Sequence, residues 1–142
     1  MNKVIAICKS EIKGTAKQCV NEINAIKDFG FENDAHAGKW HRQVSLLELE
    51  KIEDFRAKGG KVEFGAFGEN LVIKGIELSK LPIGQIIKIN DVLLEVTQIG
   101  KECHTKCVIS QQVGFCIMPI NGIFAKVISG GNIKVNDEVI LL

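Results

Sequence analysis

The chain has 142 residues, 46% of them hydrophobic and 25% charged, with a formal net charge of +1. This length fits one domain over residues 1–142, because two domains would each have too little core. A nearly neutral chain cannot neutralise many phosphates, which argues against duplex nucleic acid as a partner.

The first apolar run, residues 4–8, predicts a buried strand. It is too short for the hydrophobic region of a signal peptide and too short to cross a bilayer. The chain has five cysteines, and an odd count is not typical of a secreted disulfide scaffold. We therefore expect reduced thiols, a cytoplasmic location and no membrane association. Cys8 and Cys19 fit the role of small buried side chains.

One segment, residues 46–58, predicts a helix. Ser45 and Glu48 have the spacing of a capping box at its start. Apolar side chains recur at helical spacing from residue 49 to residue 55, and a glycine pair at 59–60 ends the run. The sequence therefore predicts one amphipathic helix that packs on another element.

Short runs rich in valine and isoleucine predict further strands, at residues 71–73, 86–89, 92–96, 124–128 and 139–142. Asn90-Asp91 separates two of these runs and has the chemistry of a tight hairpin turn. Residues 133–137 repeat the pattern around this turn, which predicts a second hairpin. Many short strands, one clear helix and no alternation of strands with helices predict a mostly β fold. We expect an antiparallel β-barrel with short extra helical turns.

Three cysteines lie in the C-terminal third: Cys103, Cys107 and Cys116. Lys101 and His104 flank Cys103, and nearby positive charge favours the reactive thiolate. Cys103 is therefore a candidate functional thiol, with a small buried side chain as the alternative. The three cysteines and His104 could instead bind zinc tetrahedrally, or Cys103 and Cys107 could be an attacking and a resolving thiol.

A polar segment upstream contains four candidate binding residues: Asp34, His36, Arg42 and Gln43. An arginine at the entry to a buried run can present its fork to a phosphate or a carboxylate. A structural alternative is open, in which Asp34 forms a turn and Arg42 is a solvated charge. The two close histidines, His36 and His41, are a weak indication of metal binding.

A third stretch has glycines at positions 65 and 68, followed by Glu69 and Asn70. Glycine permits unusual backbone angles or the close approach of a ligand. On its own, this stretch indicates a structural loop.

Taken in order, these stretches resemble the MOSC domain. This domain forms the C-terminus of molybdenum cofactor sulfurase and also occurs as small stand-alone bacterial proteins. The resemblance rests on three motifs: Asp34-x-His36-x-Gly38 with Arg42-Gln43-Val44-Ser45, then Gly65-x-Phe67-Gly68-Glu69-Asn70-Leu71, then a cysteine after the strand Glu95-Val96-Thr97-Gln98. The likeness extends over nearly the whole chain.

The resemblance implies a β-barrel of the pyruvate-kinase-barrel type and an association with the molybdenum cofactor. By similarity, Cys103 is a molybdenum ligand or a sulfur acceptor. His104 and Cys107 are additions of this chain beside that cysteine, and Cys107 is a weaker candidate metal ligand from its residue type alone. The cofactor-binding candidates are Asp34, His36, Arg42, Gln43, Glu69, Asn70, Lys101 and His104. The chain departs from many relatives in having Glu102, rather than proline, before the cysteine.

The resemblance favours a module that binds the molybdenum cofactor or carries sulfur destined for it. Its partners would be the cofactor or its sulfur donor, and a molybdoenzyme or a cofactor-biosynthesis protein. One alternative is a molybdenum-dependent reductase of N-hydroxylated compounds that takes electrons from a separate donor. Another is a structural or zinc-binding β-barrel used for protein contacts. Pyridoxal phosphate is not expected, because the aminotransferase-like half of the sulfurase is missing.

Overall fold

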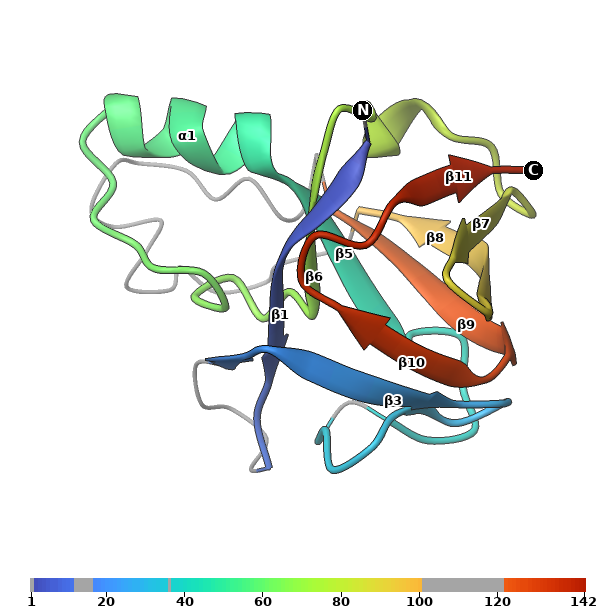
Figure 1. Ribbon diagram of the computed structural model, residues 1–142. Helices are drawn as coiled ribbons and strands as arrows, with labels where there is room; N and C mark the ends of the chain where they lie inside the picture. The colour runs from blue at the N-terminus through green and yellow to red at the C-terminus, as the bar shows by residue number, and fades with distance from the viewer. Residues whose placement is uncertain (1, 12–16, 36, 101–121) are drawn as a thin grey trace.

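The computed structural model describes residues 2–11, 17–35, 37–100 and 122–142. Two β-sheets and one α-helix form the described part of the chain (Figure 1). Seven residues discussed above lie outside the described ranges: His36, Lys101, Glu102, Cys103, His104, Cys107 and Cys116.

Strands predominate, as predicted, and α1 is the one α-helix of the described residues. In chain order the elements are β1 (Lys3–Lys9), β2 (Gln18–Val20), β3 (Glu22–Ile26), β4 (Gly30–Phe31), β5 (Val44–Glu48), α1 (Leu49–Ala57), β6 (Leu71–Lys74), the 3₁₀ turn η1 (Leu78–Lys80), β7 (Ile86–Ile89), β8 (Val92–Ile99), β9 (Ile123–Ser129), β10 (Gly131–Lys134) and β11 (Val139–Leu141). The larger sheet has the order β11-β7-β8-β9-β5-β6-β1-β2, and the smaller sheet has the order β10-β3-β4.

The larger sheet is mixed, so the prediction of a purely antiparallel sheet is wrong at one place. Strands β5 and β6 run parallel, with Leu46 opposite Leu71 and Glu48 opposite Ile73. Neighbouring parallel strands need a long crossover, and α1 with residues 58–70 provides it. The chain therefore contains one strand–helix–strand unit that the sequence pattern did not reveal.

Helix α1 begins at Leu49 rather than at residue 46, because the residues before it form β5. Leu46 and Leu47 are both fully buried, and a strand buries consecutive side chains on its two faces. The predicted capping box is therefore wrong: Ser45 lies inside β5, and Glu48 at the N-cap makes no side-chain capping bond. The predicted end is confirmed by a positive φ of 99° at Gly59. No helix in the described residues is long and apolar enough to cross a membrane.

The predicted hairpin between β7 and β8 is confirmed, with Asn90 at a positive φ of 55°. The second predicted hairpin is wrong, because β10 pairs with β3 and β11 pairs with β7. Asn136 N–H donates to the Val4 carbonyl, so the chain after β10 joins β1 instead of folding back. Among the described residues, the strand ladders form an open sheet with β11 and β2 at its ends.

Two hydrophobic clusters cover the two faces of the larger sheet. The larger cluster lies between the two sheets. The smaller cluster lies under α1 and contains Ala6, Cys8, Leu47, Ile52, Phe55, Phe67, Val72 and Phe124. A β-bulge after Val4 inserts one residue, so Val4 and Ile7 face the larger cluster although three positions separate them. Cys8 then faces the side covered by α1.

Replacing Ile52 by alanine should lower the free energy of unfolding by about 2–5 kcal/mol, because it leaves a cavity between α1 and the sheet. Glu53→Ala is the matched control, since Glu53 is an exposed residue of the same helix. Urea denaturation measures both variants. Equal losses in the two variants would contradict the packing of α1 described here.

Candidate functional site

A row of residues crosses five strands of the larger sheet, and the residue just before a sixth, at one level. Its members, from β2 to β8, are Cys19, Cys8, Asn70, Ser45, Phe124 and Gln98. Strand register places Cys19 opposite Cys8, and Phe124 opposite both Ser45 and Gln98. Backbone hydrogen bonds join Asn70 to Cys8 (2.7 Å) and to Ser45 (2.8 Å). We call this set the cross-strand row; it brings segments that are distant in sequence to one end of the sheet.

The side chain of Asn70 fastens β1 to β5 just before β6 begins. Its Nδ2 donates to the Cys8 carbonyl at 3.0 Å, and its Oδ1 accepts from the Ser45 N–H at 2.9 Å. The Ser45 hydroxyl donates to the Gly68 carbonyl at 2.8 Å. These contacts hold the local structure together, and the predicted contact of Asn70 with a cofactor stays a prediction.

Glu69 closes the loop before β6. Its carboxylate oxygens accept the N–H groups of Gly65 at 2.9 Å and of Phe67 at 3.0 Å. Burial raises the pKa of Glu69, although these N–H groups and the charge of Lys17 act in the opposite direction. Gly65 has a positive φ of 94°, and a Cβ there would lie 2.3 Å from the Lys17 carbonyl oxygen. The close approach expected at this glycine is therefore made by the chain itself.

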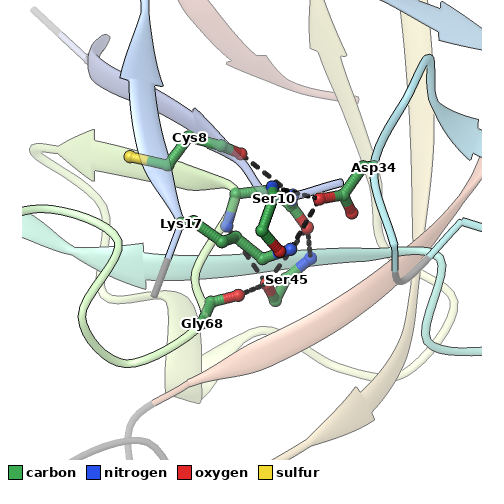
Figure 2. Close-up of polar contacts among 7 residues, drawn as sticks. Cys8, Ser10, Lys17, Asp34, Ser45 and Gly68 are labelled. Atoms are coloured by element: carbon green, nitrogen blue, oxygen red, sulfur yellow. Dashed lines mark hydrogen bonds and ion pairs between the residues drawn. The ribbon is translucent and has the colours of Figure 1, made fainter. Parts of the chain in front are cut away.

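Asp34 forms a buried ion pair with Lys17, a residue that sequence reasoning missed. The Nζ–Oδ1 distance is 2.6 Å and both side chains are fully buried. The Ser10 N–H donates to the same oxygen at 3.1 Å, and Figure 2 shows the three residues beside Ser45. Asp34 Oδ2 is buried without a hydrogen-bond partner among the described residues. A buried acceptor without a donor is costly, so this oxygen is a candidate ligand contact.

Arg42 lies at the other side of the row, half-buried and anchored by one nitrogen. Its Nε donates to Gln98 Oε1 at 3.0 Å, and its guanidinium carbon lies 5.2 Å from the centroid of the Phe124 ring. His41 Nε2 lies 2.9 Å from the same oxygen and donates to it, because Gln98 Nε2 donates to the Gly100 carbonyl. No partner for the two terminal nitrogens of Arg42 is found among the described residues.

A β-bulge in β8 explains how Gln98 reaches Arg42. The register of β8 and β9 shifts between Val96 and Gln98, which inserts Thr97. The hydroxyl of the inserted Thr97 contacts the His41 carbonyl. Bulges commonly change the direction of neighbouring side chains near functional sites.

Just beyond, the Gly100 N–H donates to the Gly122 carbonyl at 2.6 Å. Gly100 and Gly122 are the described residues on either side of residues 101–121. Gly100 also accepts a bond from Gln98, so it lies next to the anchor of Arg42.

Gln43 is fully buried beside β9. Its Oε1 accepts the Val127 N–H at 2.9 Å, whereas its Nε2 has no partner among the described residues. The structure thus supplies a second buried polar atom for which the described chain provides no partner.

The predicted site residues fall into three groups. Asp34, Glu69 and Asn70 lie together with Lys17, Ser10 and Ser45. Arg42 lies above Phe124 in the same row, and Gln43 is buried beside β9. The described ranges contain no group of three histidine, cysteine or acidic side chains able to hold a metal ion. The predicted zinc and molybdenum ligands lie outside those ranges.

A cavity of about 420 Å³ lies at the opposite end of β5. Its lining residues are Glu48, Glu50, Lys51, Gly75, Ile76 and Glu77. None of the predicted site residues lines it, and its three carboxylates disfavour an anionic ligand.

A family model described as the MOSC domain matches residues 33–140, which is more than half of the chain. The chain belongs to the MOSC domain family. This family is generally associated with binding of the molybdenum cofactor. The resemblance found in the sequence is therefore confirmed at the level of the family.

Solved structures share the fold. The YUAD protein from Bacillus subtilis has a TM-score of 0.81 and 16% identity, with 98% of this chain and 94% of that chain covered. YiiM from Geobacillus stearothermophilus has a TM-score of 0.74 and 17% identity, with 100% and 75% covered. YiiM from Escherichia coli has a TM-score of 0.66 and 19% identity, with 99% and 69% covered. No curated protein sequence matches the MOSC chain.

Replacing Lys17 by methionine should lower the free energy of unfolding by about 3–5 kcal/mol, because the buried carboxylate of Asp34 loses its counter-charge. The double variant Lys17→Met/Asp34→Asn should lose less than the sum of the two single variants. Lys80→Met is the control, because Lys80 pairs with Glu77 at 2.9 Å but is exposed, and it should show no measurable loss. Additive losses in a urea-denaturation cycle would contradict the coupling.

Proposed function

We propose that this MOSC chain binds the molybdenum cofactor next to Phe124 and Gln98 in the cross-strand row. Cys103 would serve there as a molybdenum ligand or as the acceptor of a sulfur atom. One observation carries the proposal: Gln98, which anchors Arg42, also bonds Gly100, from which the chain continues toward Cys103. A cation for the phosphate and a thiolate for the metal would then be available at one end of the sheet.

The phosphate contact is assigned to Arg42. A guanidinium group holds phosphate by two parallel charge-assisted hydrogen bonds. The Nε bond to Gln98 and the stacking on Phe124 fix the orientation of this fork before any ligand arrives. Such preorganisation lowers the entropy lost when the ligand binds.

The thiol contact is assigned to Cys103 from chain length. Cys103 is three residue steps along the chain from Gly100, and three fully extended steps span at most about 11 Å. The bond between Gly100 and Gly122 fixes the start of this span beside Gln98. A thiolate is a suitable ligand for a soft metal centre.

The pterin part of the cofactor offers several N–H donors and ring acceptors. Asp34 Oδ2 and Gln43 Nε2 are a buried acceptor and a buried donor without partners in the described chain, so their chemistry fits such a ring. Lys17 would keep the Asp34 carboxylate oriented through its 2.6 Å contact. The cofactor, when bound, supplies a molybdenum centre for redox or sulfur chemistry, and the chain supplies the binding groups.

We also propose that the larger sheet closes into the barrel expected from the family resemblance. Two bonds support this closure: the Val4 N–H donates to the Asp137 carbonyl at 3.0 Å, and the Asn136 N–H donates to the Val4 carbonyl at 2.8 Å. They connect β1 to the chain just before β11.

A sulfur donor and a recipient molybdoenzyme are the partners that a carrier of cofactor sulfur would need.

Arg42→Ala should weaken binding of the isolated cofactor by about 10–100-fold, because a charge-assisted hydrogen bond contributes about 1.5–3 kcal/mol. Arg56→Ala is a closely matched control: Arg56 also donates through Nε to a carbonyl and stacks on a phenylalanine, Phe64, at 4.8 Å. Molybdenum analysis and the fluorescence of the oxidised pterin measure bound cofactor. Equal retention in the two variants would overturn the phosphate assignment.

Cys103→Ser should remove the protein-bound molybdenum–thiolate contact or the transferable sulfane sulfur, because a hydroxyl is a poor substitute for a soft thiolate. Cys19→Ser is the control, since Cys19 is an exposed thiol on β2. Molybdenum content and sulfane sulfur are measured after anaerobic purification. Full retention of both in Cys103→Ser would show that the thiol assignment is wrong.

A further inference from the structure

Two cysteines outside the proposed cofactor contacts face each other at the edge of the larger sheet. Strands β1 and β2 pair antiparallel with Cys8 directly opposite Cys19, and the two sulfur atoms are 3.6 Å apart. Both are free thiols. Cys19 is exposed, contrary to the expectation that it is a buried side chain.

The backbone geometry favours a bond between these sulfur atoms. The N–H and the C=O of Cys8 both bond to Asn70 on the β6 side, so neither group is directed at β2. Cys8 and Cys19 are therefore a non-hydrogen-bonded pair of the antiparallel ladder, in which side chains approach most closely. Cα atoms of such a pair lie about 4.5 Å apart, which falls within the range of disulfides.

The two thiols differ in access and in environment. Cys19 lies on the edge strand and is open to small reagents. Cys8 is fully buried, and burial, with smaller contributions from Cys19 and Glu69, raises its pKa, while Lys17 acts in the opposite direction. A small oxidant would therefore react first with Cys19, and Cys8 is placed to react second.

We propose that Cys8 and Cys19 form a reversible cross-strand disulfide by exchange with low-molecular-weight disulfides such as oxidised glutathione. In the first step the Cys19 thiolate attacks one sulfur of the oxidant, whose S–S bond breaks. A mixed disulfide forms, and one small thiol leaves and takes up a proton. In the second step Cys8 gives its proton to solvent and attacks the Cys19 sulfur, which releases the second small thiol. Two electrons pass from the two protein thiols to the oxidant.

The disulfide would act on the buried ion pair. The chain between the two cysteines carries Ser10 and Lys17, both of which bind Asp34. A bond from Cys8 to Cys19 closes this stretch into a covalent loop and restricts its opening. Oxidation is thus expected to hold Lys17 on Asp34 more firmly, whether or not the chain binds a cofactor.

Peptide mapping of the wild-type chain tests the proposal directly. After incubation with oxidised glutathione and quenching with an alkylating agent, trypsin releases Cys8 in residues 4–9 and Cys19 in residues 18–27. We expect these two peptides joined in most molecules, and separated again by dithiothreitol. The peptides that carry Cys103, Cys107 and Cys116 are distinct, so their reactions do not interfere.

Two variants and one further measurement complete the test. In Cys8→Ala, Cys19 should stop at the glutathione adduct, and in Cys19→Ser, Cys8 should stay reduced. Oxidation of the wild type should slow hydrogen exchange at the Ser10 and Lys17 amides at least tenfold, with no change in Cys8→Ala. A wild-type protein that keeps glutathione on Cys19 while Cys8 stays a free thiol would overturn the proposal. Oxidation without slower exchange at these amides would overturn the coupling to the ion pair.

Discussion

The side-chain amide of Asn70 is the constraint on which this end of the MOSC chain depends. Strand β6 lies between β1 and β5 in the sheet but begins only at Leu71. One residue before β6, the Asn70 side chain holds β1 and β5 together: it donates to the Cys8 carbonyl and accepts the Ser45 N–H. All of these groups are buried, so a lost bond would leave an unsatisfied polar atom.

Because β1 and β5 are fixed here, the groups around them acquire defined positions. On one side, the N–H of Ser10, two residues after Cys8, donates to Asp34, which also pairs with Lys17. On the other side of the row, Ser45 lies opposite Phe124, and the guanidinium of Arg42 stacks on the Phe124 ring. The sheet therefore presents a paired carboxylate and an anchored cation along one row, with Gly100 beside Gln98, the residue that anchors the cation. A ligand with both a phosphate and N–H donors matches this distribution of charge.

The sequence predicted the parts of the fold that depend on local patterns. The β7–β8 turn followed from Asn90, the end of α1 followed from the glycines at 59–60, and the family followed from the order of three motifs. Features that depend on pairing between distant segments could not be predicted. Leu46 and Leu47 continue the apolar face of a helix in the sequence, but their burial on two sides of a sheet makes them a strand.

The candidate site shows the same division between local and distant information. Asp34 and Arg42 stood out by residue type, whereas Lys17 is an ordinary lysine until folding places it 2.6 Å from Asp34. The exposure of Cys19 depends on β2 being the edge strand, which no local pattern reveals.

The proposed cofactor site lies at the end of the sheet that holds Arg42 and Asp34. Nitrogen-15 NMR of the chain, titrated anaerobically with the isolated cofactor, measures this directly. We expect joint shifts of the Arg42 Nε–H signal and of the Ser10 and Gly100 amides, with the Arg56 Nε–H signal unchanged. Shifts confined to residues around the Glu48 cavity, with Arg42 unmoved, would contradict it.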